Sequence, residues 1–283
     1  TGQFAGLLRR EAGPLPPTYD LRKYDGNPLT LREGERLCIY GHSGAGKTTL
    51  LRASLGLTRY RGEVVWHVPR SSTGYAAQSP RLLPRATTLQ QILWCAQLHG
   101  VFLSPHGSRI HELLNGWRLW AHRQRIASRL SPGEQAKLEM CCAMAVASRL
   151  LVVDGLLDTL DEATRTGFWE EVDARCARRE LALLYATSST REAEMADRVL
   201  LLHEGRLLAM DTPERLRART TPDVVRLQPV QDFGKQQSLK VYIRQSEEDI
   251  ITQDNGIARE LILQRMPTIE DVLTALLRQG GWQ

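Results

Sequence analysis

Residues 41–48 constrain this chain more than any other segment. They match the pattern G-x-x-x-x-G-K-[ST] and read Gly41, His42, Ser43, Gly44, Ala45, Gly46, Lys47, Thr48. The glycines let the backbone turn so that successive N–H groups point at an anion, and a helix starting near Lys47 adds its positive end. Residues 36–40 favour a buried strand, and residues 49–53 favour the start of a helix. The pattern therefore predicts a phosphate cradle between a strand and a helix.

Length and charge narrow the class of protein. The 283 residues suffice for one large α/β domain and a small second one. The net charge is +5, with 37 basic and 32 acidic residues interspersed, so a nucleic-acid partner is not expected. No apolar run approaches the ~20 residues that span a bilayer, so membrane contact is expected to be peripheral.

The termini and the cysteines point to a reducing compartment. The first residues lack the pattern of a secretory signal, and the five cysteines show no C-x-x-C spacing. We therefore expect a cytoplasmic location and buried thiols.

Further elements follow the cradle in a definite order. A short strand, 74–78, ends in Gln78, and a proline-punctuated loop follows it. Apolar spacing predicts helices over 87–98 and 109–127 and a long helix ending near residue 149, and then a strand that ends on Asp154. The tryptophans expected to anchor the helical segment are Trp94, Trp117 and Trp120. A last strand, 181–186, ends in Thr187, Ser188 and Ser189.

This order of motifs resembles the ATP-binding subunits of ABC transporters over about residues 18–215. The resemblance implies a P-loop α/β core of the RecA-like type, with a helical signature subdomain at about 86–149. It also implies bound ATP and Mg²⁺. The nucleotide contacts that it implies are Gly41, His42, Ser43, Gly44, Ala45, Gly46, Lys47, Thr48, Thr49, Gln78, Asp154 and Tyr19, with Tyr24 as an alternative to Tyr19. Those implied for magnesium are Thr48, Gln78 and Asp154.

Two positions depart from the family pattern at the γ-phosphate. The family places a water-polarising glutamate after the magnesium aspartate, and this chain has Gly155. The family ends the next strand in Thr-His, and here Ser188 replaces the histidine. His203 is expected on another strand, and Asp158 on the turn into the inter-subunit loop, so neither is expected to take over. A lost general base costs about 10²–10⁴-fold in rate, so impaired hydrolysis is predicted, with ATP binding retained.

The signature motif also departs from the pattern. Ser131 and Gly133 fall in it, but Pro132 replaces the first glycine. Ser131 and Glu134 fit a capping box, so one interpretation is simply a well-capped helix. In the other interpretation, this helix start faces the nucleotide of a second subunit, with the charge of Glu134 opposing that role. Asp161 falls on the loop that the family turns toward the sister subunit.

The C-terminal part changes character. Short strands are predicted at 224–227, 239–243 and 260–263, with a turn at 254–256. A helix capped by Thr268 follows, with its apolar stripe on Ile269, Val272, Leu273 and Leu276. This tail resembles that of ATPases from the drug-resistance and polysaccharide branch of ABC exporters. Its role stays open between dimerisation and packing on its own domain. The predicted domains are an arm at 1–17, a nucleotide-binding domain at 18–215 and an α+β appendage at 216–283.

The resemblance as a whole implies an ATP-binding subunit of an exporter, peripheral on the cytoplasmic face of the inner or plasma membrane. Its expected partners are a different, catalytically complete ATPase subunit and transmembrane permease subunits. Two alternatives remain. One is a slow homodimeric transport ATPase, and the other is an ATP-dependent scaffold or regulatory module that works without a permease.

Overall fold

A computed structural model describes residues 29–60, 64–219, 223–229, 239–244, 261–265 and 267–279. The chain divides after Ala209 into two compact units. The predicted limits at residues 17 and 215 remain predictions. No described helix has both the length and the apolar character that crossing a membrane requires.

A six-stranded sheet forms the centre of the first unit, and its last strand continues two residues past Ala209, to Asp211. Its strand order is β2-β3-β4-β1-β5-β6. The strands are β1 (Arg36–Tyr40), β2 (Thr73–Ala76), β3 (Leu150–Asp154), β4 (Ala182–Thr187), β5 (Arg198–His203) and β6 (Arg206–Asp211). The pairs β2–β3, β3–β4, β4–β1 and β1–β5 are parallel, so the carboxyl ends of these five strands share one edge. Such an edge is where α/β proteins bind ligands. The predicted α/β fold is therefore confirmed.

The central strands are apolar because both faces of the sheet are covered. All five residues of β3 are buried, as are the last four of β1. The helices α1 (Lys47–Ser54), α5 (Glu162–Ala177) and α6 (Thr190–Ala193) follow β1, β3 and β4 respectively. This alternation is typical of parallel sheets. None of the five cysteines forms a disulfide. Four of them are buried as expected, and Cys95 is half-exposed.

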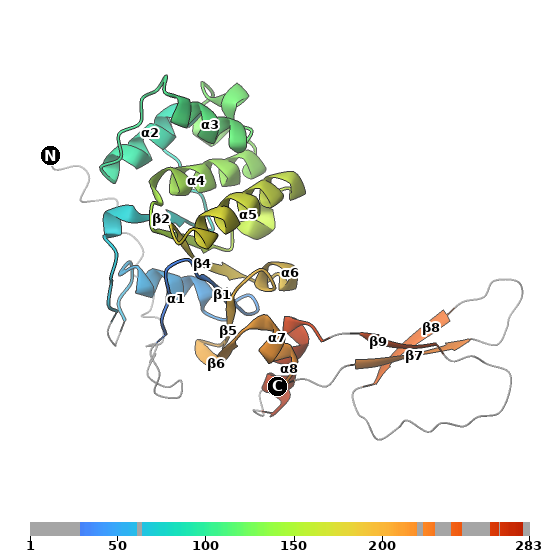
Figure 1. The fold of residues 1–283 in the computed structure, drawn as a ribbon. Helices are drawn as coiled ribbons and strands as arrows, with labels where there is room; N and C mark the ends of the chain where they lie inside the picture. Colours follow the sequence, from blue (N-terminus) through green and yellow to red (C-terminus); the bar gives the residue numbers. More distant parts are fainter. Residues whose placement is uncertain are drawn as a thin grey trace, which may run out of the picture. The chain divides into compact units, whose positions relative to one another are not determined.

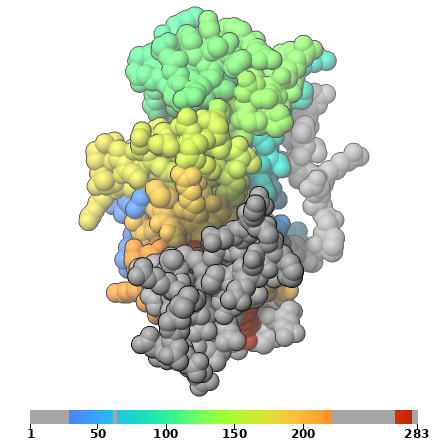
Figure 2. Space-filling view, turned by 90° about the vertical axis from the view of Figure 1, so that its right-hand side faces the viewer, coloured from blue at the N-terminus to red at the C-terminus, as the bar shows by residue number. Residues whose placement is uncertain are grey.

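A helical lobe is inserted between β2 and β3. It contains α2 (Thr88–Leu98), α3 (Ser108–Gly116) and α4 (Pro132–Val146). Figure 1 shows α4 between the α2–α3 pair and the sheet, and α4 packs on both α2 and β2. In the space-filling view the lobe, coloured green, gathers at one end of the unit (Figure 2).

Three predictions for this lobe differ from the structure. The expected helix over 109–127 stops at Gly116, because Arg118 takes a left-handed φ of 56° and the chain continues in two short 3₁₀ turns. Trp117 is a buried anchor as expected and Trp120 is half-buried, but Trp94 is 45% exposed. The long helix ends at Val146, three residues earlier than predicted.

The second unit holds a separate three-stranded sheet. Its order is β8-β7-β9, and both pairs are antiparallel. The strands are β7 (Asp223–Pro229), β8 (Leu239–Arg244) and β9 (Leu261–Arg265), close to the predicted positions. The helices are α7 (Pro213–Arg217) and α8 (Ile269–Gln279), and they pack on each other. The predicted turn at 254–256 lies outside the described residues.

The predicted cap and stripe of α8 are present. Thr268 Oγ1 accepts a hydrogen bond from Asp271 N at 3.4 Å, which caps the helix start. Ile269, Val272 and Leu273 are buried, and Leu276 is half-buried. The stripe therefore packs within the described part of the protein, as a sequence period of three to four residues predicts.

Candidate functional site

The phosphate loop lies between β1 and α1, as predicted. At Gly41, a Cβ atom would lie 2.3 Å from the carbonyl oxygen of Leu202 on β5, so any side chain there would collide with backbone. Gly46 caps α1 with a left-handed φ of 100°, a conformation that favours glycine. His42, Ser43 and Gly44 are exposed, so this face of the loop is open to a ligand. The loop is therefore shaped by its strand and helix before any ligand binds.

Lys47 extends across the loop that precedes it. Its Nζ donates to the carbonyl oxygens of Gly41 at 2.7 Å and His42 at 2.9 Å. Burial lowers the pKa of Lys47, and the nearby charges of Asp158 and Asp154 oppose that shift. The ammonium group is thus already held at the mouth of the loop. Thr49, half-buried on the first turn of α1, follows Thr48 in the same segment.

A pair of polar side chains joins the loop to the end of β3. Thr48 Oγ1 donates to Asp154 Oδ1 at 2.8 Å, and Asp154 is 2% exposed. Tyr75 on β2, which the sequence analysis gave no role, donates its hydroxyl to Asp154 Oδ2 at 3.3 Å. Burial raises the pKa of Tyr75, so its hydroxyl keeps its proton near neutral pH. Both oxygens of the buried carboxylate therefore have fixed donors.

Gln78 completes the predicted magnesium set. Its side chain lies beside Gly155, where a Cβ would approach the Gln78 amide nitrogen at 3.6 Å. The three predicted ligands Thr48, Gln78 and Asp154 thus lie in one neighbourhood. Hydroxyl, amide and carboxylate oxygens suit a hard cation such as Mg²⁺. The set of donors is compatible with this ion.

The loop after Gln78 is fastened to the helical lobe. Glu139 on α4 is 8% exposed and accepts from Ala77 N at 3.2 Å and Arg81 N at 3.3 Å. Gln91 on α2 accepts from Leu83 N at 2.9 Å. Burial raises the pKa of Glu139, and the two N–H donors act against that shift. Sequence reasoning missed both residues, because a polar residue among the buried residues of a helix gives no local signal of its partner.

Gly155 and Ser188, the two positions that depart from the expected family pattern, lie at the ends of adjacent strands. Gly155 follows β3, and its N–H donates to Ala186 O on β4 at 2.9 Å. Its φ is 63°, in the left-handed region. Ser188 follows β4 and is exposed. His203 lies at the end of β5, as expected.

Asp158 has a more specific contact than its place in the sequence suggested. It lies on a 3₁₀ turn, Leu157–Thr159, and the sequence analysis placed it on a turn. Its Oδ1 accepts a hydrogen bond from Thr187 Oγ1 at 2.9 Å. Thr187 is fully buried and pairs in register with Tyr40, the residue before the phosphate loop. A carboxylate is therefore fixed near the cradle.

The signature segment forms the predicted capping box. Glu134 N donates to Ser131 Oγ at 3.3 Å, and Ser131 N donates to Glu134 Oε2 at 2.8 Å. These contacts lower the pKa of Glu134, and His122 Nε2 lies 3.1 Å from its other oxygen. Ser131, Pro132 and Gly133 are exposed. The helix start is both capped and accessible, which fits either interpretation of the motif.

Asp161 is exposed and caps the N-terminus of α5. Its Oδ1 accepts from Thr164 N at 3.0 Å, and its other oxygen pairs with Lys137 on α4. The lysine holds the pKa of Asp161 well below its usual range. The loop is thus tied to the signature helix.

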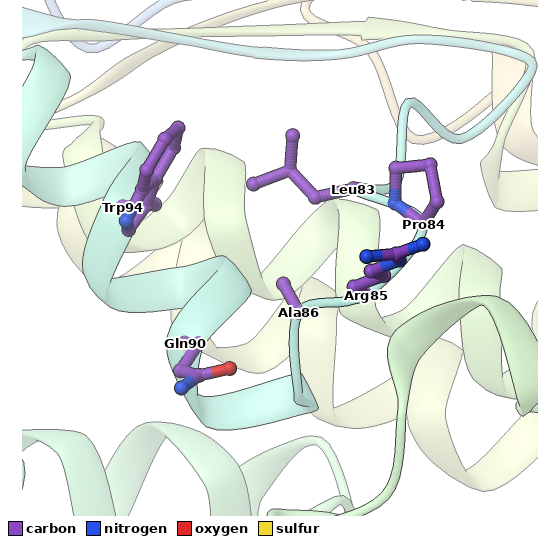
Figure 3. A pocket seen from close by; sticks show the side chains of 6 residues that line it. All are labelled: Leu83, Pro84, Arg85, Ala86, Gln90 and Trp94. Atoms are coloured by element: carbon purple, nitrogen blue, oxygen red, sulfur yellow. The ribbon is translucent and has the colours of Figure 1, made fainter.

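A surface hollow of about 500 Å³ opens between the loop after Gln78 and α2. Its lining is mainly apolar, and Figure 3 shows Leu83 and Trp94 facing the same space. The lining residues are Leu83, Pro84, Arg85, Ala86, Gln90 and Trp94. We call this feature the α2 groove. Leu98 and Phe102, 78% and 88% exposed, follow Trp94 at intervals of four residues.

The predicted adenine contacts, Tyr19 and Tyr24, lie outside the described residues. The residues of the predicted arm at 1–17 do so as well.

The sequence of this chain is similar to those of known ATP-binding proteins of ABC transporters. Residues 24–157 match the family model described as ABC transporter. The chain is 30% identical over 219 residues to the Fe(3+) ions import ATP-binding protein FbpC 2 of Rhizobium meliloti, covering 74% of this chain and 55% of that protein. It is 30% identical over 204 residues to the lipoprotein-releasing system ATP-binding protein LolD of Paramagnetospirillum magneticum, covering 67% and 90%. The chain spans about half the length of the import proteins that it matches.

Solved structures share the fold. An ATP-binding subunit of an ABC transporter superposes with a TM-score of 0.59 at 23% identity, covering 68% of this chain and 84% of that one. A dimeric ATP-binding cassette in a post-hydrolysis state, bound to ADP and Pi, gives a TM-score of 0.56 at 19% identity, covering 65% and 88%.

Proposed function

Because this chain belongs to the ABC transporter family, as one of its ATP-binding proteins, we propose that it binds Mg-ATP at the loop 41–48 and works beneath a membrane permease. The observation that carries the proposal is the pairing of Thr48 with Asp154 at 2.8 Å, next to the loop and Lys47. This pairing brings a hydroxyl and a carboxylate for a cation to the place where the backbone N–H groups gather.

The residues of the loop fit a triphosphate. His42 to Gly46 offer backbone donors, and Lys47 exchanges its two carbonyl partners for phosphate oxygens when the nucleotide binds. A bound Mg²⁺ would neutralise phosphate charge, and Thr48, Asp154 and Gln78 would hold it. Tyr75 keeps the Asp154 carboxylate oriented.

We further propose that hydrolysis at this chain's own site is slow. Gly155 has no side chain to take a proton, and Ser188 cannot contact a γ-phosphate as an imidazole does. Loss of one general base costs about 10²–10⁴-fold in rate. Binding is spared, because the cradle and the donors for magnesium lie on other residues.

The α2 groove is proposed as the docking place of the permease. A free scaffold or regulatory module would have a polar surface there, whereas the lining of this groove is mostly apolar. The segment 81–130 carries seven arginines and one acidic residue, Glu112, so the partner segment is expected to be acidic. The arginines are Arg81, Arg85, Arg109, Arg118, Arg123, Arg125 and Arg129. These features favour the transporter subunit over the scaffold.

A second ATPase subunit is the other proposed partner. In a sandwich dimer, the exposed start of α4 at Ser131 and Gly133 would complete the partner's site. This arrangement uses the signature segment of this chain, in which Pro132 replaces the first glycine, and needs its partner to supply the missing glutamate and histidine. A slow homodimer stays an alternative, and high turnover of the purified chain would favour it.

Export is proposed from the C-terminal segment alone. Its sheet β7–β9 and helix α8 fit the predicted α+β appendage. The names of the two relatives above, an import protein and a protein of a lipoprotein-releasing system, describe those proteins. A peripheral location on the cytoplasmic face of the membrane is also proposed, because the chain is proposed to work beneath a membrane permease.

The test is nucleotide binding by the full chain. Wild-type protein should bind Mg-ATP, and Lys47→Ala should abolish binding, because the cation expected at the β- and γ-phosphates is lost. Arg59→Ala, which changes an exposed basic residue beyond the end of α1, is the matched control and should bind normally. Equal affinity of the Lys47→Ala variant, measured by calorimetry, would refute the assignment of the cradle.

A further inference from the structure

Asp158 places a carboxylate close to positions 155 and 188, where the site lacks the expected glutamate and histidine. Thr187, whose hydroxyl donates to Asp158 Oδ1 at 2.9 Å, lies between Ala186 and Ser188 in the chain. Ala186 O in turn accepts from Gly155 N at 2.9 Å. Thr187, which anchors Asp158, is therefore next in the chain both to Ala186, which contacts Gly155, and to Ser188.

The anchor is rigid and adjoins the cradle. Thr187 is 0% exposed, and its Cα is the register partner of Tyr40, which directly precedes Gly41. A hydroxyl on a buried strand end has little freedom, so the bond restricts the rotation of the Asp158 side chain. The carboxylate is thus held at the end of the sheet where the phosphate loop begins.

The other carboxylate oxygen of Asp158 is available. Within the described part of the chain, Oδ2 has no hydrogen-bond or ion-pair partner, and the residue is exposed. The charge of Asp158 also acts on the Lys47 ammonium and opposes the lowering of the Lys47 pKa by burial. One oxygen is therefore anchored, and the other is open to solvent near the lysine that is expected to contact the β- and γ-phosphates.

We propose that Asp158 is the carboxylate that activates water at this site, in place of a residue at 155. The proposal rests on the proposed binding of Mg-ATP. Asp158 takes a proton from water as the water oxygen bonds to the γ-phosphorus. The bond from that phosphorus to the β,γ-bridging oxygen breaks, and its electron pair leaves with ADP. The proton then passes from Asp158 to solvent. The slow hydrolysis of the chain depends on this residue.

Asp158→Asn separates this role from a structural one. An asparagine side-chain oxygen can still accept the bond from Thr187, so the turn is preserved, but the amide cannot take a proton. The change also removes a negative charge near the terminal phosphate. ATP carries that phosphate and ADP does not, so ATP affinity should rise relative to ADP affinity by about fivefold or more. A purely structural contact predicts no such change in the ratio of affinities.

The experiment uses the purified full chain with Mg-ATP and Mg-ADP. We expect Asp158→Asn to lower single-turnover hydrolysis by about 100-fold or more, and to raise the ratio of ATP to ADP affinity. Glu170→Gln, at an exposed carboxylate on α5, is the charge-matched control and should change neither quantity. Asp158→Ser is the second variant if the asparagine protein does not fold.

Three outcomes would overturn the proposal. They are normal hydrolysis by a folded Asp158 variant, an unchanged ratio of affinities, and wild-type turnover no faster than that of Lys47→Ala. Absence of ATP binding by the wild-type chain is a different result, because it would refute the proposed function itself. The binding measurement therefore distinguishes the two failures.

Discussion

Restoring the family residues at the end of β3 and β4 should raise turnover and lower stability together. The variant is Gly155→Glu combined with Ser188→His. Gly155 has a φ of 63°, and holding a residue with a side chain there costs about 1–2 kcal/mol. The space itself is adequate, because the nearest atoms to a Cβ are those of the Gln78 side chain at 3.6–3.7 Å. The strain is therefore conformational rather than steric.

The expected kinetic gain is larger than the strain. A general base contributes about 10²–10⁴-fold, which corresponds to about 3–5 kcal/mol of barrier at 1.36 kcal/mol per tenfold change. Ser188 is exposed, so a histidine can be placed there without repacking the core. We expect turnover to rise at least tenfold, while the free energy of unfolding falls by about 1–2 kcal/mol.

The assay combines phosphate release with urea unfolding, each followed with and without Mg-ATP. Gly155→Ala is the control, since it carries the strained φ without a carboxylate. It should lose similar stability and gain no activity. A double variant that binds ATP yet turns over at the wild-type rate would refute the reasoning, as would a Gly155→Ala protein of unchanged stability.

Two further predictions concern partners. Ser131→Arg should abolish hydrolysis by the assembled complex but leave ATP bound to this subunit, because a bulky side chain replaces the cap at the exposed start of α4 while Lys47 and Asp154 are untouched. Ser104→Arg, at another exposed serine, is the control, and a fully active Ser131→Arg complex would favour the scaffold. Trp94→Ser should remove most of the co-purifying permease by taking an apolar wall from the α2 groove. Leu57→Ser, which changes an exposed apolar residue outside the groove, is the control and should leave the amount of co-purifying permease unchanged. An equal loss of permease from both variants would contradict the docking assignment.

The local motifs could be predicted from the sequence because their chemistry is local. The loop 41–48, the strand that ends on Asp154 and the capping box at Ser131 each depend on a few neighbouring residues. The end of the helix at Gly116 could not, because the apolar spacing continues through Trp117 and Trp120. Only the left-handed Arg118 shows that the chain turns there.

The contacts of the candidate site depend on residues far apart in the chain. Tyr75 and Asp154 meet because β2 and β3 are neighbours, and no spacing rule reports this. Asp158 was correctly placed on a turn, but its bond to Thr187 follows from the alignment of β3 with β4. The exposure of Trp94 likewise depends on which face of α2 meets α4, and an apolar residue type alone does not reveal it.

The anchoring of the segment 77–83 by Glu139 and Gln91 has a thermodynamic consequence. The same short segment carries Gln78 at one end and the wall of the α2 groove at the other, with Leu83 fixed to α2. If Gln78 helps to hold Mg-ATP as proposed, a molecule in the groove that favours one position of this segment will change the affinity for nucleotide. Reciprocity then requires that nucleotide change the affinity of the groove by the same factor. The free energy of this linkage can be measured from either end, by titrating one ligand in the presence of the other.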